Sequence, residues 1–191
     1  MRVTQQEMDA SHERIVEGAA RLFRERGVRA TSVADAMNAA GLTHGGFYRH
    51  FKTKDDLVIE SLRVAFDSFT APLETRNKDE PPDQVAAEFK ALYLSAEHVA
   101  NPGLGCPIPA IGSELARESA PIKAEFSVGL QRMLDALVKS HSGTDSERCD
   151  AAARELAMLV GAVVLARASD GAIGSRLLDA CRKPCRASAP V

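Results

Sequence analysis

The sequence predicts an all-α protein of about nine helices, in which an N-terminal three-helix head is joined to a larger helical body. Apolar residues recur at the three- and four-residue spacing of helices in one segment after another. Ser32 with Asp35, and Thr144 with Glu147, match the capping box, in which a hydroxyl and a carboxylate satisfy free amides at a helix start. No segment alternates as a strand does, so the 191 residues, 45% of them hydrophobic, should build their core from helices.

Two helices are expected first in the head. A loose polar arm should lead to a helix at about 11–26, which Gly27 ends. A second, short helix begins after Ser32 and ends at Gly41. Its apolar face comprises Val33, Ala36, Met37 and Ala40.

A third short helix should turn polar and aromatic groups outward. Thr43 can cap it, and Phe47 and Phe51, four residues apart, share its buried side. The opposite, exposed side carries His44, Gly45, Tyr48 and Arg49. Two short helices joined by a glycine turn are typical of the helix-turn-helix, which places its second helix in a DNA major groove. On spacing alone, a helical hairpin of a larger bundle is the alternative.

The body should follow as a series of longer helices. They are expected at 54–69, 84–99, 106–117, 119–140, 144–168 and 173–182. Prolines and charges mark 70–83 as a loop, and the Pro/Ala/Ser-rich stretch 183–191 is expected to be a disordered tail.

The run GGFYRHFKTKDDL at 45–57 resembles the DNA-binding signature of the TetR/AcrR family of bacterial transcriptional regulators. The resemblance reaches back to about His12. It implies a helix-turn-helix DNA-binding domain at 1–53 and an effector-binding and dimerisation domain at 54–182. It also implies a homodimer, formed by the last two long helices, on a palindromic DNA operator. Filling of the monomer core is the alternative role for those helices.

The same resemblance assigns roles on the DNA. Tyr48, His50, Lys52 and Lys54 match positions that grip the DNA backbone or support that grip, although His50 could instead only pack within the head. Thr43, His44 and Arg49 should reach base edges or phosphates. The full expected DNA-binding set is Ser32, Thr43, His44, Gly45, Gly46, Tyr48, Arg49, His50, Lys52 and Lys54.

Two features of this region depart from a strong recognition helix. Gly45 and Gly46 weaken a helix, which suggests close approach of the backbone to DNA or ordering on binding. Neither glycine offers a side chain to the bases, and Ala34 supplies no polar group where many relatives carry one. Sequence readout should therefore depend on few side chains and on DNA shape.

Charge is divided along the chain in a way that suits a DNA-binding head. Residues 1–54 carry nine Lys/Arg against six Asp/Glu, whereas 55–191 carry fifteen against twenty. An acidic body that DNA repels would help to orient the encounter.

The body offers candidates for recognition of an effector. A pocket for a small organic molecule could be formed by Phe66, Phe69, Phe89, Tyr93, His98, Phe126 and Met133, although aromatics at helical spacing are more often plain core. Cys106, at an expected helix start, is a possible redox or electrophile sensor, because helix-start amides favour a thiolate. A small buried residue is the alternative for Cys106.

Other classes of protein find little support. No paired acids, nucleophile motif or phosphate loop indicates an enzyme, and the histidines and four cysteines show no metal-ligand spacing, so no cofactor or metal is expected. With no export signal or membrane span, we expect a cytoplasmic protein that does not bind membranes. A helical small-molecule-binding protein with weakened or lost DNA binding remains the rival function. The expected function is a repressor released from its operator by a small-molecule or reactive-electrophile effector of unknown identity.

Overall fold

The computed structural model describes residues 4–183, and every element of regular structure in that range is a helix. The α-helices are α1 (Gln5–Arg26), α2 (Val33–Ala39), α3 (Lys54–Asp79), α4 (Pro82–Tyr93), α5 (Ala96–Ala100), α6 (Pro107–Leu115), α7 (Ala120–Val138), α8 (Asp145–Ala168) and α9 (Gly171–Arg182). Two 3-10 helices, η1 (His44–Arg49) and η2 (Pro102–Leu104), complete the set. The predicted all-helical fold is confirmed, and nearly all of the predicted tail lies outside the described residues.

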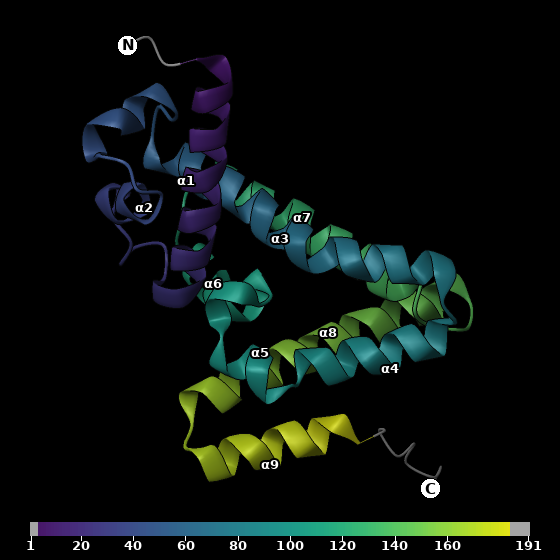
Figure 1. Cartoon of the computed structure of the whole chain (residues 1–191). Coiled ribbons are helices and arrows are strands. Elements are labelled where there is room, and N and C mark those ends of the chain that lie inside the picture. The colour runs from purple at the N-terminus through teal and green to yellow at the C-terminus, as the bar shows by residue number, and fades with distance from the viewer. Residues whose placement is uncertain (1–3, 184–191) are drawn as a thin grey trace, which may run out of the picture.

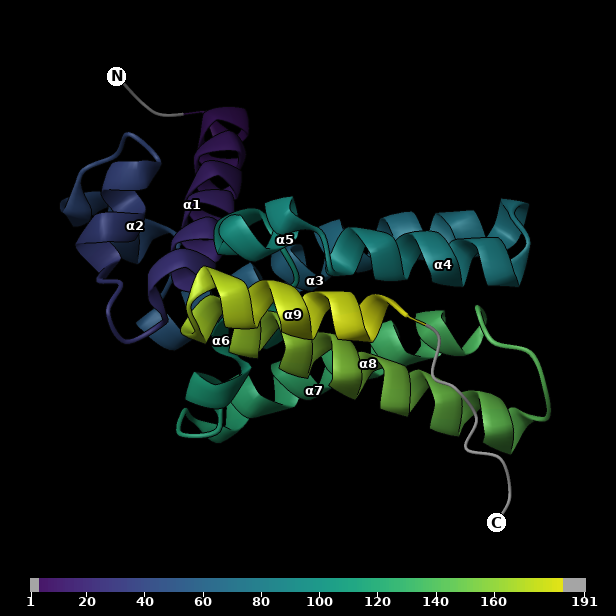
Figure 2. The same cartoon turned by 90° about the horizontal axis from the view of Figure 1, so that it is seen from below.

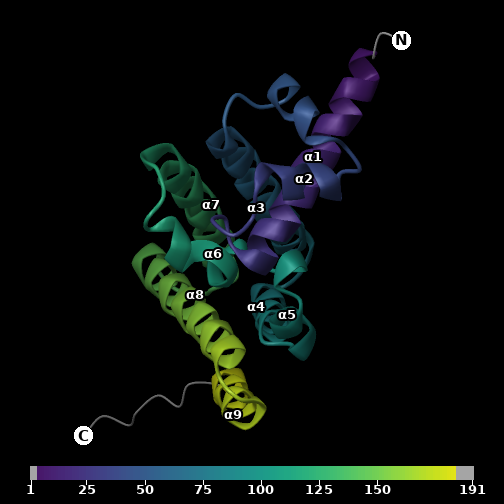
Figure 3. The same ribbon diagram turned by 90° about the vertical axis from the view of Figure 1, so that its left-hand side faces the viewer.

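The helices form a small head and a larger body joined by α3. Figure 1 shows α1 and α2 at one end of the molecule, with α3 running out of this head alongside α7. Seen from below, α9 lies across α8 (Figure 2), and the side view places α9 at the end of the body remote from α1 (Figure 3). None of the described helices is long and apolar enough to cross a membrane.

Two buried clusters hold the fold together. The first contains the apolar faces of α1, α2, η1 and the start of α3, and it continues into the body through Ile111, Leu115 and Ile122. The second fills the body between α4, α7 and α8. Because the first cluster includes residues of α6 and α7, the head packs on the body through a shared core.

The first helix is longer at its N-terminus than predicted. It begins at Gln5, so the expected loose arm up to residue 11 is wrong. Thr4 and Glu7 form a capping box in which the Thr4 hydroxyl accepts from the Glu7 amide at 3.2 Å and the Glu7 carboxylate accepts from the Thr4 amide at 2.8 Å. This Thr-x-x-Glu signal is present in the sequence and explains the earlier start.

The helix after the head is also longer than predicted. It runs through Pro72 to Asp79, so the predicted loop at 70–83 is wrong over most of its length. Proline removes one backbone hydrogen bond and usually kinks a helix. Here Pro72 is exposed, while Thr70 and Leu73 on the neighbouring face are buried. Tertiary packing of that face therefore outweighs the local signal of the proline.

The expected single helix at 84–99 is divided in two. The break lies at Leu94 and Ser95, between α4 and α5. The Ser95 hydroxyl accepts a hydrogen bond from the His98 amide at 3.0 Å, which caps the new helix. This break fixes the position of His98 in the body.

Candidate DNA-binding and effector sites

The predicted recognition element is a 3-10 helix, η1, and not a regular α-helix. Its first residue follows Thr43, which makes no side-chain cap, so the predicted cap is wrong. Phe47 is buried and stacks on Phe51 with ring centroids 5.4 Å apart. On the outer side, the Tyr48 side chain is 74% exposed. The aromatic anchor thus holds η1 on the head while its polar side faces solvent.

The outer side of η1 and the turn that follows it carry positive charge that is not paired with a carboxylate among the described residues. His44, Arg49 and Lys52 are exposed, and within residues 4–183 neither Arg49 nor Lys52 forms an ion pair with a carboxylate. A methyl group added at Gly45 would meet no atom within 4 Å, and one at Gly46 would meet only Met37 Cε at 3.4 Å. The fold of the head therefore does not itself require glycine at 45.

Three of the expected DNA-binding residues have structural roles in the head. The Ser32 hydroxyl caps α2 by accepting from the Asp35 amide at 3.1 Å, as the capping box predicted. His50 lies half-buried beside His12 and Phe51, and burial lowers the pKa of its imidazole. Lys54 turns back and donates from Nζ to the Val28 carbonyl at 2.6 Å. Lys54 thus braces the head in this structure, which does not show it free for a phosphate.

A carboxylate from the body closes the end of α1. The Glu114 side chain of α6 accepts hydrogen bonds from the amides of Val28, at 2.9 Å, and Arg29, at 2.6 Å. Farther along, the Ser119 hydroxyl donates to Asp55 at the start of α3, at 2.7 Å. The α6 region is therefore hydrogen-bonded to both sides of the head.

The residues proposed for an effector pocket separate into two groups. Phe66 and Phe126 pack together in the core shared with the head, with ring centroids 5.6 Å apart. The body core contains the others, Phe69, Phe89, Tyr93, His98 and Met133. The seven side chains therefore divide between two buried clusters, and the effector pocket that they were expected to line stays a prediction. Phe66 and Phe69 are three residues apart on α3, and Phe126 and Met133 are seven apart on α7, so the two groups lie at successive levels along these helices.

A cavity does open beside part of the second group. Its volume is about 280 Å³, and Phe69, Leu92, His98, Asn101, Leu104 and Gly105 contribute to its wall. The Phe69 and His98 rings stack with centroids 5.4 Å apart, which gives the cavity an aromatic side. Leu104 and Gly105 were not among the residues expected to line an effector pocket.

His98 and Cys106 form a buried hydrogen-bonded unit behind this wall. The imidazole donates from Nδ1 to the Tyr93 carbonyl at 2.6 Å, and its Nε2 accepts from the Cys106 amide at 3.1 Å. This pattern requires a neutral ring, and burial lowers the His98 pKa.

The thiol of Cys106 is not activated in this conformation. It is fully buried, and burial raises its pKa to about 11, outweighing the opposite effects of Tyr93, Arg24 and Arg167. The expectation of a helix-start thiolate is therefore wrong here, because Cys106 is shielded from water. Cys149, by contrast, is exposed.

The fold and the η1 surface together define a helix-turn-helix protein with a helical body. The family model "Bacterial regulatory proteins, tetR family" matches residues 15–60. HTH-type transcriptional repressor KstR2 of Mycobacterium tuberculosis is 35% identical over 86 residues, which are 44% of this chain and 43% of that protein.

A second relative matches over most of its length. The uncharacterized HTH-type transcriptional regulator MT0206 of M. tuberculosis is 31% identical over 174 residues, covering 84% of this chain and 86% of that protein. The chain belongs to the tetR family of bacterial regulatory proteins. Among solved structures, AibR in complex with isovaleryl coenzyme A and operator DNA superposes with a TM-score of 0.62 at 18% identity, over 90% of this chain and 96% of that one. The family model and the 31% identical relative confirm the predicted family, and the superposition shows that the two chains share a fold.

Proposed function

We propose that this chain is a transcriptional repressor that binds a palindromic operator as a homodimer and leaves it when a small molecule binds the body. Residues 1–53 would read the DNA, and 54–182 would bind the effector and dimerise. The solved complex of AibR with isovaleryl coenzyme A and operator DNA supports a function that combines a small molecule with DNA, since the two chains share a fold. The proposed activity is regulatory and not catalytic.

The observation that carries the DNA-binding proposal is the outer surface of η1. Tyr48 presents a hydroxyl that is free to donate to a phosphate, and Arg49 and Lys52 present positive charge without an acidic neighbour in contact. Because these cations have no ion pair among the described residues, contact with DNA phosphates would break none within the head. The rigid aromatic packing beneath them fixes their spacing.

The dimer is proposed from apolar side chains on the outer face of the last helices. Val164 is 41% exposed, Leu165 53% and Ile173 46%, although α8 is otherwise a core helix. A second copy of the chain would cover this surface, with α8 as the central helix. Replacing Val164 and Leu165 by arginine should yield a monomer in sedimentation equilibrium. A dimer that survived would place the interface elsewhere, and Val128→Arg on α7 would then test the other predicted helix.

The DNA-binding proposal is tested by selection of genomic DNA fragments with the purified protein. We expect one imperfect palindrome, with affinity that falls steeply as salt rises. Lys52→Ala should weaken binding to all sequences and reduce the salt slope by about 1, whereas Arg49→Ala should also relax preference at one base pair if it contacts guanine. Tyr48→Phe isolates the phosphate contact of the hydroxyl.

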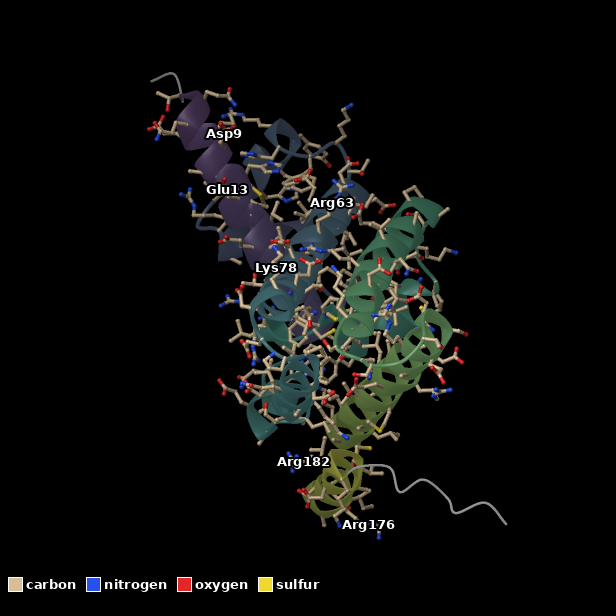
Figure 4. All side chains as sticks on the ribbon, turned by 90° about the vertical axis from the view of Figure 1, so that its right-hand side faces the viewer. Asp9, Glu13, Arg63, Lys78, Arg176 and Arg182 are labelled. Carbon is tan, nitrogen blue, oxygen red and sulfur yellow. The ribbon has the colours of Figure 1, made fainter. Side chains whose placement is uncertain are left out.

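Lys78→Ala is the matched control for the lysine variant. Lys78 is exposed near the C-terminal end of α3, far along the chain from the head (Figure 4). Its loss should leave DNA affinity unchanged. Recovery of no preferred sequence, with and without cell-extract small molecules, would contradict a repressor and favour a ligand-binding protein that no longer reads DNA.

A further inference from the structure

Two arginines enter the interior of the body without an acidic partner. Arg24 of α1 is 9% exposed, and Arg167 of α8 is half-buried. Within residues 4–183, neither forms an ion pair with a carboxylate, and the Nη1 atom of each is buried without a hydrogen-bond partner. A buried guanidinium normally has a counter-charge, because removing the charge from water is costly.

Both guanidinium groups are held by backbone carbonyls of one segment. Arg24 donates from Nε and Nη2 to the Gly103 carbonyl, at 2.9 and 2.5 Å. Arg167 donates from Nε to the Val99 carbonyl at 3.0 Å and from Nη2 to the His98 carbonyl at 2.8 Å. In each arginine the Nη1 group is therefore left to donate to another acceptor.

The two positive charges act on the same buried centre. Both lower the pKa of the Cys106 thiol, although burial dominates, and burial lowers the pKa of both arginines. The Tyr93 hydroxyl lies against this thiol and has no other partner among the described residues. Two guanidinium groups and a phenol therefore lie near Cys106 with buried donors that no described residue accepts from, although the Glu25 carboxylate also acts on the charge of Arg24.

Open space adjoins this centre on both sides of Leu104. One side is the cavity of about 280 Å³ with Phe69 and His98 in its wall, to which the acidic residue Glu97 also contributes. The other is a cleft of about 530 Å³ to which Arg24 and Arg21 contribute. Leu104 is 75% exposed and belongs to both walls.

We propose that Arg24 and Arg167 bind the charged group of an organic anion whose short apolar part lies against Phe69, His98 and Leu104. This inference deepens the proposed function by naming the chemical class of the effector. A carboxylate or a phosphate ester would accept from the two Nη1 groups and from the Tyr93 hydroxyl.

Binding of the anion would compete with an existing contact. The Gly103 carbonyl is a neutral acceptor, whereas an anion adds Coulombic attraction to the guanidinium and can accept two parallel N–H bonds from it. An anion that drew Arg24 away from Gly103 would release α1 from η2. Because Arg24 belongs to the DNA-binding head and Gly103 to the wall of the cavity, this exchange would connect the ligand to the head.

The test uses three probes with the same hexyl tail on the purified full-length protein without DNA. Hexanoate, hexyl phosphate and hexanamide are titrated by calorimetry against the wild type. We expect at least one of the two anions to bind about tenfold or more tightly than the neutral amide, as expected for a charge-assisted contact in a buried site. A preference for hexanoate identifies a carboxylic acid effector, and a preference for hexyl phosphate a phosphate ester.

Variants then identify the residues. Arg24→Met and Arg167→Met should each weaken the preferred anion about tenfold while leaving hexanamide unchanged. Arg117→Met is the matched control, because Arg117 is exposed on the link between α6 and α7, and it should change neither. If a variant does not fold, the comparison of probes on the wild type still decides the question.

Three results would each overturn the proposal. They are equal or tighter binding of hexanamide, no binding of any probe, and anion binding that both arginine variants retain. These titrations contain no DNA. If the operator selection failed, the titrations would still test the anion site, and a negative titration would not contradict operator binding.

Discussion

Replacing Glu114 by glutamine should loosen the head by a predictable amount. The Glu114 carboxylate accepts from two successive backbone amides, Val28 at 2.9 Å and Arg29 at 2.6 Å. A glutamine can accept only through its carbonyl oxygen, so one amide N–H would face the NH2 group and lose its partner. Losing one charge-assisted hydrogen bond and leaving a donor unsatisfied costs about 1.5–3 kcal/mol. Because the Arg29 residue is exposed, we expect the low end, about 1.5–2 kcal/mol.

The assay is urea and thermal unfolding, with amide exchange of Val28 and Arg29 as a local reporter. For a chain of this size, about 1 kcal/mol lowers Tm by about 2–4 °C, so Glu114→Gln should lower it by about 3–8 °C. The two amides should exchange faster than those of the α1 interior.

Glu118→Gln is the matched control for this prediction. Glu118 is close by and pairs with the Arg29 guanidinium at 2.8 Å, but that guanidinium is 60% exposed. Exposed ion pairs contribute little to stability, so this variant should change Tm much less. Equal effects of the two substitutions, or unchanged exchange of Val28 and Arg29 in Glu114→Gln, would refute the assignment of Glu114 as the link between α6 and the head.

Three further predictions concern single residues. Gly45→Ala should raise the free energy of unfolding by up to about 1 kcal/mol, because the added methyl group meets no atom. The same variant should bind the operator more weakly if the backbone at residue 45 lies against DNA. Unchanged DNA affinity would exclude that close approach. At pH 8 a thiol reagent should modify exposed Cys149 rapidly and Cys106 only on unfolding, because a pKa of about 11 leaves little thiolate at Cys106. Peptide mass mapping would measure the two rates, and similar rates would contradict a buried Cys106. Burial lowers the pKa of His98 in the folded state, so below about pH 6.5 the unfolded chain binds more protons and the free energy of unfolding should fall as pH drops. His98→Gln should flatten that dependence in urea titrations, and an unchanged slope would assign it to other groups.

Local signals in the sequence were sufficient for most of the fold. The capping boxes at Ser32 and Thr144 occur where predicted, because a hydroxyl and a carboxylate three residues apart satisfy helix-start amides without help from the rest of the chain. The same logic explains the missed start of α1, since the Thr4 and Glu7 pair is also a local signal that could have been found. Pro72 misled the prediction for the opposite reason. Its local effect is overridden by burial of neighbouring side chains against other helices.

The sites were less accessible from sequence because they depend on contacts between distant segments. Nothing near Lys54 in the chain indicates that its ammonium group would bond to the Val28 carbonyl. Arg24 and Arg167 were not singled out at all, since charged residues on amphipathic helices usually face solvent. Cys106 was correctly placed near a helix start, but its burial follows from packing against α4 and α8, which helix-start chemistry does not report.

The contacts between head and body lie within one continuous stretch of the chain. Arg24 bonds to Gly103, the end of α1 bonds to Glu114, and the start of α3 bonds to Ser119. The first of these contacts lies at the wall of the cavity, and the other two lie on and just after α6, which begins directly after Cys106. A displacement at the cavity wall would therefore act on both sides of the head through α6, whereas a displacement of α9 would act first on α8. Ligands that enter beside Leu104 should consequently affect DNA binding more strongly than substitutions on the outer face of α9, because the former disturb the hydrogen bonds that join the head to the body.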